Sequence, residues 1–155
     1  MARAVKGTKM KNDRYIVIVG CGRLGSYLAN QLSRDGNSVV VIDRNENTFH
    51  GLSPDFSGFR VEGDATQIAV LKEVKMREAD TLIATTHEDN VNLMVAQVAR
   101  KIFSVPHVLA RVFDPNREGV YVQLGIDTIC PTSVAADMFL RAVANGTTDE
   151  DGARS

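Results

Sequence analysis

A glycine pattern that directly follows an apolar run near the start of the chain most constrains the fold. The run Ile16 to Val19 consists of β-branched residues, a composition typical of a strand buried on both faces of a sheet. Gly20, Gly22 and Gly25 follow with the spacing G-x-G-x-x-G. In a strand–turn–helix unit these glycines permit a tight turn, leave room for a phosphate and allow close helix packing. The N–H groups that begin the helix then face the anion. The pattern therefore predicts a site for a dinucleotide or an adenine nucleotide.

An acidic residue at the end of the next apolar run strengthens this prediction. The run Ser38 to Asp43 reads as a second strand, and Asp43 lies 18 positions beyond Gly25. A spacing of about 20 is expected for a carboxylate that binds the ribose hydroxyls of a dinucleotide. The alternative is an acid that only caps or solvates a strand end. A carboxylate here would repel a 2′-phosphate, which favours NAD over NADP, although the neighbouring Arg44 moderates that preference.

Composition excludes several other classes of protein. A chain of 155 residues with 44% hydrophobic and 24% charged residues is typical of one globular domain. The net charge of -1 gives no general argument for a nucleic-acid partner, and we expect none. Cys21 and Cys130 form no disulfide framework and match no metal-ligand spacing. The absence of a long apolar run or a signal core indicates a soluble intracellular protein.

Strand and helix patterns alternate six times along the chain. This alternation predicts an α/β, Rossmann-like, doubly wound parallel six-stranded sheet of order 3-2-1-4-5-6, with helices on both faces. Its ligand crevice would lie at the carboxyl ends of strands one and four. The expected strands are 16–19, 38–43, 59–62, 80–85, 108–111 and 127–130. The expected helices follow the glycine turn and then cover about 67–74, 86–102, 116–124 and 131–144, with a short helix broken before Pro54 within 45–56.

Two helices carry further information. The helix that follows the fourth strand has apolar residues at spacings of three and four, which predicts one apolar stripe: Val91, Met94, Val95, Val98 and Ile102. The last helix has apolar residues on more than one face, which indicates that it packs on, or crosses to, a second subunit. The alternative is that the helix is simply buried under the basic N-terminal leader. Outside a domain over 14–144, a basic leader (1–13) and an acidic tail (145–155) read as flexible. The leader could alternatively approach an anionic membrane or partner.

Several motifs together resemble one family. They are Val19-Gly-Cys-Gly-Arg-Leu-Gly25, Val41-Ile-Asp-Arg44, Gly63-Asp-Ala-Thr66 and Thr85-Thr-His-Glu-Asp-Asn90, with Arg111 and Gly125-Ile-Asp127 in addition. The chain resembles the RCK or KTN (TrkA-N) nucleotide-binding domain of bacterial Trk/Ktr-type potassium-uptake regulatory subunits, over about residues 14–144. The combination of the arginine in the first motif with Gly-Asp-Ala-Thr is the more specific part of this resemblance.

The resemblance implies a non-enzymatic, cytoplasmic regulatory subunit at the inner face of the membrane. It would form homodimers and then rings, bind NAD(H) or ATP/ADP/AMP, and gate an integral-membrane potassium channel or transporter. By position, the phosphates would be held by Gly20, Cys21, Gly22, Arg23, Leu24 and Gly25. Asp43 would bind the ribose and Arg44 would lie along the adenine, whose pocket Gly63, Asp64, Ala65 and Thr66 would wall. Thr85, Thr86 and Asn90 would line the phosphate or nicotinamide side, and Arg111 could reach the far end of the ligand.

Two departures from the family pattern limit what the resemblance implies. Family members often carry Pro-Glu at the start of the last helix, whereas this chain has Pro131-Thr132, so we expect no metal there. The second, C-terminal lobe common in the family is lacking. The sequence is therefore expected to be either a truncated chain or a single-lobe subunit that relies on a partner.

Individual residues also have simpler interpretations. Arg23 could be a solvated cation, although a cation at a helix N-terminus is unfavourable unless an anion is near. Asp64 and Thr66 could be an N-cap and a first-turn residue. Cys21 reads as a small space-filler rather than a redox-sensing thiol, and His87 as solvent-facing.

Two enzyme classes compete with the regulatory interpretation. An NAD-dependent oxidoreductase would need a substrate pocket and an acid–base residue, yet the chain has no second domain and no tyrosine with a lysine four residues on. A methyltransferase would normally add an antiparallel strand, and nothing after Pro131 reads as one. The sequence also lacks the G-x-x-x-x-G-K-[ST] motif of nucleotide hydrolysis.

Overall fold

The computed structural model describes residues 13–146, and almost all of the expected leader and tail lies outside them. Its centre is one six-stranded parallel sheet with the order β3-β2-β1-β4-β5-β6, which confirms the predicted topology. The two halves of the sheet diverge between β1 and β4, where a doubly wound fold places its ligand crevice. The strands are β1 (Tyr15–Val19), β2 (Ser38–Asp43), β3 (Phe59–Glu62), β4 (Thr81–Ala84), β5 (His107–Arg111) and β6 (Asp127–Ile129).

The helices follow the predicted order, apart from the unpredicted 3₁₀-helix η2 (Met76–Glu78) and two differences within predicted segments. The segment after β2 forms the 3₁₀-helix η1 (Glu46–Gly51), and the single helix expected over 116–124 is divided into a 3₁₀ turn and an α-helix. Asp114 and Pro115 account for the second difference, because the Asp114 side chain accepts the N–H of Asn116 and starts the tight turn. The other helices are α1 (Arg23–Arg34), α2 (Ile68–Glu73), η2 (Met76–Glu78), α3 (Asp89–Lys101), η3 (Pro115–Arg117), α4 (Glu118–Gln123) and α5 (Pro131–Asn145).

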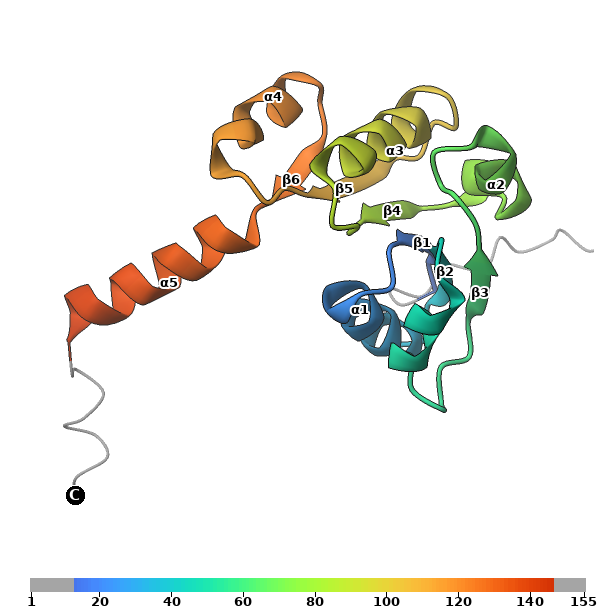
Figure 1. Cartoon of the computed structure of the whole chain (residues 1–155), viewed down its shortest axis with the longest axis horizontal. Coiled ribbons are helices and arrows are strands. Elements are labelled where there is room, and N and C mark those ends of the chain that lie inside the picture. The colour runs from blue at the N-terminus through green and yellow to red at the C-terminus, as the bar shows by residue number, and fades with distance from the viewer. Residues whose placement is uncertain (1–12, 147–155) are drawn as a thin grey trace, which may run out of the picture.

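Each face of the sheet has its own apolar core. Val17, Val19 and Leu82 point to the face covered by α2, α3 and α4, while Ile16 and Ile18 point to the face covered by α1 and η1 (Figure 1). The alternation follows from strand geometry, because successive side chains point to opposite faces. Both cores are built around β1, so the strand that leads into the glycine turn is held from two sides.

The buried face of α3 differs from the predicted stripe. Met94 and Ile102 are 47% and 46% exposed, whereas Asn92, Ala96 and Ala99 are fully buried beside Val95. Small side chains let α3 lie close to β4 and β5, and that proximity decides which face is buried. Val95 is buried and Val91 and Val98 pack against the same core, so the prediction, which counted only large apolar residues, was right for part of the buried face.

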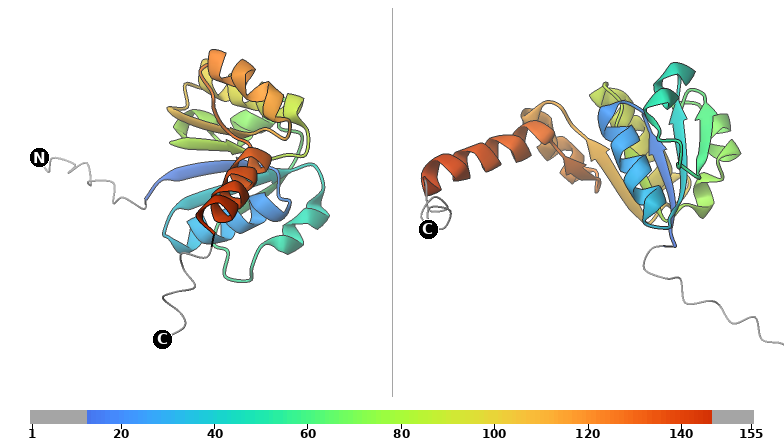
Figure 2. Two further views of the ribbon diagram at one scale, coloured as in Figure 1. Left: turned by 90° about the vertical axis from the view of Figure 1, so that its left-hand side faces the viewer. Right: turned by 90° about the horizontal axis from the view of Figure 1, so that it is seen from below.

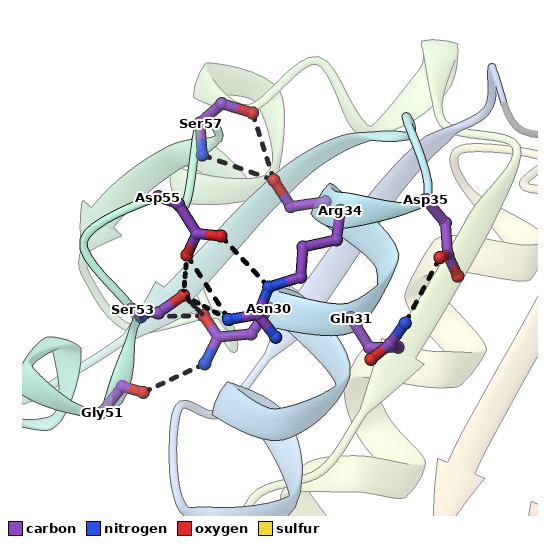
Figure 3. Close-up of polar contacts among 9 residues, drawn as sticks. Asn30, Gln31, Arg34, Asp35, Gly51, Ser53, Asp55 and Ser57 are labelled. Atoms are coloured by element: carbon purple, nitrogen blue, oxygen red, sulfur yellow. Dashed lines mark hydrogen bonds and ion pairs between the residues drawn. The ribbon is translucent and has the colours of Figure 1, made fainter.

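A polar cluster fastens the crossover from β2 to β3 onto α1 (Figure 3). Asn30 donates to the carbonyl of Gly51 and accepts from the backbone N–H of Ser53. Arg34 pairs with Asp55 at 3.1 Å and donates to the Ser53 hydroxyl. Hydrogen bonds from Arg34 and Ser53 lower the pKa of Asp55 to about 2, so the pair stays charged at neutral pH. The cluster fixes η1, one wall of the cavity described below.

Helix α5 extends away from the rest of the molecule (Figures 1 and 2). Its large apolar side chains remain exposed, including Phe139 at 74% and Val143 at 79%. On the side of the sheet where α1 lies, Ile83 and Leu109 are neighbours on β4 and β5. Ile129 on β6 lies on the same side, in register with Arg111, and is half exposed. Within residues 13–146 no helix combines the length and apolarity needed to span a bilayer.

Candidate nucleotide-binding site

A cavity of about 280 Å³ opens at the carboxyl ends of β1, β2, β3 and β4. Its walls are formed by the loops that leave these strands, including the segment between β4 and α3, and by η1. It therefore lies where a doubly wound sheet binds its ligand. The predicted residues that line it are Gly20, Gly22, Asp43, Arg44, Gly63, Asp64, Ala65, Thr66, Thr85 and Thr86.

Two of the glycines are required by the fold itself. Gly20 has a φ of +100°, and a side chain there would lie 2.9 Å from the backbone of Thr85 and Thr86. A Cβ on Gly25 would lie only 1.9 Å from the carbonyl oxygen of Gly20. Because no side chain fits at either place, α1 begins close against the turn that ends β1. The pattern thus sets the position of the helix N-terminus at the cavity.

Gly22 is different, because the protein leaves space beside it. It is the N-cap of α1 and supplies no side-chain cap, and the first turn of α1 contains no acidic residue. A Cβ on Gly22 would meet only the ring of His87, at 3.5 Å. The first N–H groups of a helix have no partner within the helix and favour an anion. An anion in the cavity could therefore reach the first N–H groups of α1 through the space beside Gly22.

Asp43 connects the end of β2 to the glycine turn. Its Oδ2 accepts the N–H of Cys21 at 2.8 Å, and its Oδ1 accepts the N–H of Asn45 at 2.8 Å. Each carboxylate oxygen retains a further lone pair, and the half-buried side chain lines the cavity. The acid can therefore position the turn and still accept hydrogen bonds from a ligand hydroxyl.

The turn after β3 forms the wall next to Arg44. Asp64 accepts both the N–H and the hydroxyl of Thr66, at 2.9 and 2.7 Å. These two hydrogen bonds, together with the charge of Arg44, lower the pKa of Asp64. Helix α2 begins only at Ile68, with Gln67 as its N-cap, so the alternative interpretation of Asp64 as the N-cap is wrong. The turn is a rigid polar wall with the small, buried Ala65 at its centre.

A buried amide holds the segment after β4. Asn92 in α3 accepts the N–H and hydroxyl of Thr86 and donates to the carbonyls of Thr86 and Arg111. Thr85 donates its hydroxyl to the carbonyls of Val19, the last residue of β1, and Gly20. Asn92 was not among the predicted site residues, and the only sequence signal was a polar residue within an apolar helix. It positions the cavity wall without lining the cavity.

Arg111 does not line the cavity in this structure. Its Nη2 donates to the carbonyls of Thr85 and Thr86 at 2.6 and 3.0 Å, and its guanidinium lies 4.5 Å from the centre of the Phe113 ring. Burial lowers the pKa of Arg111, and its buried Nε has no partner among the described residues. The side chain therefore holds the backbone that follows β4 and does not face the cavity.

Other predicted residues also lie outside the cavity lining. Arg23 is exposed on the first turn of α1, Leu24 is half-buried, and Asn90 is exposed and accepts from Arg117. Cys21 contributes its backbone N–H to Asp43 while its thiol is buried. Burial and the nearby Asp43 raise the pKa of that thiol to about 11. The structure therefore favours a space-filling Cys21 over a redox-sensing one.

A family model for the TrkA-N domain matches residues 16–132, which include the whole cavity. The chain belongs to the TrkA-N family. It is 43% identical over 127 residues to the Trk system potassium uptake protein TrkA of Streptomyces coelicolor, covering 82% of this chain and 57% of that protein. The TrkA-N chain thus spans a little over half the length of this relative.

Solved structures agree with this fold. A TrkA-N domain of the inner membrane protein ybaL from Escherichia coli is 20% identical with a TM-score of 0.74, covering 85% of this chain and 98% of that one. A crystal structure of GsuK bound to ADP is 27% identical with a TM-score of 0.71, covering 86% of this chain and 34% of that one. The family identified from the motifs is therefore confirmed.

The TrkA-N cavity also has lining residues that were not predicted as site residues. Apolar Val19, Ile42 and Val91 contribute alongside polar side chains, and their strand and helix positions gave no sign of exposure to a ligand. The polar additions are Thr48, His87 and Glu88.

Among residues 13–146 no cluster of three or more His, Cys, Asp or Glu side chains could hold a metal ion.

Proposed function

We propose that this TrkA-N domain is a nucleotide-sensing regulatory module that binds NAD(H) or an adenine nucleotide in the cavity at the carboxyl end of its sheet. The observation that carries the proposal is the open N-terminus of α1 beside Gly22, with the Asp43 carboxylate on the same cavity. Backbone N–H groups would hold the diphosphate and Asp43 would accept the ribose hydroxyls. The polar turn from Gly63 to Thr66 would wall the adenine.

The relatives support both the ligand class and the setting. GsuK, at 27% identity, is a protein whose crystal structure contains ADP, and the Streptomyces coelicolor relative is a potassium uptake protein. We infer that this chain acts at the cytoplasmic face of a membrane potassium channel or transporter. Arg23, on the first turn of α1, could turn toward a terminal phosphate, and Arg111 would act through the end of β4.

The assembly follows from the exposed apolar surfaces. Helix α5 presents Met138, Phe139 and Val143 to solvent, while Ile129 is exposed at the edge of the sheet. Each surface lacks a cover within residues 13–146, and a second copy of the chain could bury both. We propose a homodimer in which α5 packs on, or crosses to, the partner, and from which larger rings are built.

Regulation then requires that the nucleotide binds two arrangements of the dimer with different affinity. Only that difference in binding free energy can shift the equilibrium between the arrangements. No chemical step is needed for such a shift. Incubation with NADH and candidate substrates should therefore give no turnover, and appreciable oxidation of NADH would instead support an oxidoreductase.

Calorimetric titration with NAD, NADH, ATP, ADP and AMP tests the site, with Asp43→Ala as the variant. We expect the substitution to weaken binding at least about tenfold, because it removes charge-assisted hydrogen bonds to the ribose and loosens the glycine turn. Asp35→Ala, an exposed acid at the end of α1 that does not line the cavity, is the matched control. Absent binding, or equal binding by all three proteins, would rule out the proposed site.

A further inference from the structure

The side chain of His87 lies on the side of the cavity that Gly22 leaves open. His87 follows β4, and Gly22 precedes α1, so the fold brings together residues from the two halves of the sheet. The Nε2 edge of the ring faces the glycine: a Cβ placed on Gly22 would lie 3.5 Å from Nε2 and 3.9 Å from Cε1. Within residues 13–146 this nitrogen has no hydrogen-bond partner, and the exposed residue lines the cavity.

Two neighbours hold the ring in this place. His87 stacks on Phe113, with ring centres 6.2 Å apart and an angle of 28° between the planes. Phe113 in turn lies under the guanidinium of Arg111, which is fixed by the carbonyls of Thr85 and Thr86. Stacked arrangements at such distances stabilise ring orientation. The imidazole is therefore supported by side chains from the end of β5.

The charges around His87 come from three neighbouring segments and from the opposite side of the cavity. On its own segment, Glu88 also lines the cavity, and Asp89 accepts the backbone N–H groups of Phe113 and Asp114. The glycine turn contributes the N-terminus of α1 and Arg23, and the segment after β5 contributes Arg111 behind Phe113 together with Asp114. Across the cavity lie Asp43, Arg44 and Asp64. Glu88 would repel a bound phosphate, and a cation beside it would offset that repulsion.

We propose that Nε2 of His87 donates a hydrogen bond to the phosphate of the bound nucleotide, so that nucleotide affinity rises as the pH falls. The inference rests on the proposed function, because it assigns a pH response to that same site. Imidazole is the side chain that ordinarily changes charge between about pH 5 and 8. A phosphate favours the protonated ring, so binding takes up a proton and is tighter on the acidic side.

Calorimetry with NAD at about pH 6 and about pH 8 tests the inference. The diphosphate of NAD keeps its charge over this range, whereas a terminal phosphate monoester titrates near pH 6 and would confuse the result. Wild-type protein should bind NAD about fivefold to tenfold more tightly at the lower pH, with uptake of a proton on binding. His87→Gln should lose this dependence and the proton uptake, because its amide carries no charge.

Two controls separate this inference from the proposed site. His50→Gln replaces an exposed histidine that does not line the cavity and should keep the wild-type pH dependence. Adenosine, which has no phosphate, should bind wild type and His87→Gln equally. A pH dependence that persists in His87→Gln, or an equal loss of adenosine binding, would overturn the role of His87 while leaving the site intact. Failure of wild type to bind NAD at both pH values would overturn the site and the role of His87 together.

Discussion

At the scale of single residues, the three glycines of the pattern are there for two different reasons. Gly20 and Gly25 are required by the backbone of the fold, because a side chain would collide with neighbouring main-chain atoms. Gly22 meets no such obstacle, and its lack of a side chain keeps the cavity open beside the N-terminus of α1. The spacing of the three glycines predicted the tight turn between β1 and α1. It could not predict His87 beside Gly22, because that contact depends on how β4 follows β1 in the sheet.

The thiol of Cys21 gives a prediction for alkaline pH. Its pKa is about 11 in the folded protein, so the unfolded chain loses this proton first as the pH rises. The free energy of unfolding should be unaffected by this group below about pH 9 and should fall on the order of 2 kcal/mol between about pH 9 and 11. Urea unfolding at about pH 8 and about pH 10.5 measures that fall.

Cys21→Ala is the variant that isolates the thiol. Burial also raises the pKa of Tyr15 and Tyr121, so part of the alkaline loss belongs to these tyrosines and remains in the variant. The variant should lose less free energy of unfolding over the same pH interval than the wild type. Equal losses would show that the thiol is not held in its neutral form by burial.

At the scale of elements, sequence patterns predicted the strands and their order but only part of the buried face of α3. The strand runs are short, β-branched and bounded by turns, so their assignment needs no tertiary information. The buried face of α3 was set instead by Ala96, Ala99 and Asn92, which allow close contact with β4 and β5. Asn90, predicted as a site residue from its place in a motif, accepts a hydrogen bond from Arg117. Asn92, two positions later, is the residue that hydrogen-bonds the segment after β4.

Asn92→Ala should therefore destabilise the protein by about 2 to 3 kcal/mol. The substitution leaves the backbone N–H of Thr86 and two carbonyls without their buried partner, and unsatisfied buried groups cost about 1 to 3 kcal/mol each before relaxation. Asn90→Ala, which removes one exposed side-chain contact, should cost less than about 0.5 kcal/mol. Urea unfolding of both variants measures the difference, and a similar loss in the two would contradict the assigned role of Asn92.

At the scale of the whole molecule, the main feature is the separation of α5 from the body of the domain (Figure 2). An amphipathic or uniformly apolar helix is stable in water only when its apolar side is covered. The apolar composition of α5 predicted that it seeks a partner, and its exposure agrees with that interpretation. The sequence could not predict where the helix would lie, because no residue of α5 is buried within its own chain.

Phe139→Glu combined with Val143→Glu should prevent association. Charges introduced at side chains that are 74% and 79% exposed in one copy cost little there, but they would be buried without partners in a dimer. Sedimentation velocity should find a dimer or larger assembly for wild type and a folded monomer for the variant. Tyr27→Glu, an equally drastic change at an exposed aromatic on α1, should leave the assembly intact, and an unchanged assembly in the α5 variant would contradict the proposed interface.

The most direct test of the central claim is the affinity of Gly22→Ala for ADP, measured by calorimetry. Within the protein the new methyl group meets only the His87 ring at 3.5 Å, so the cost in stability should stay below about 1 kcal/mol, that of a changed N-cap. In the complex the methyl group would occupy the space where the diphosphate approaches the backbone. We predict a folded variant whose ADP affinity is at least about tenfold weaker; an unchanged affinity would contradict the claim that the start of α1 holds the phosphates.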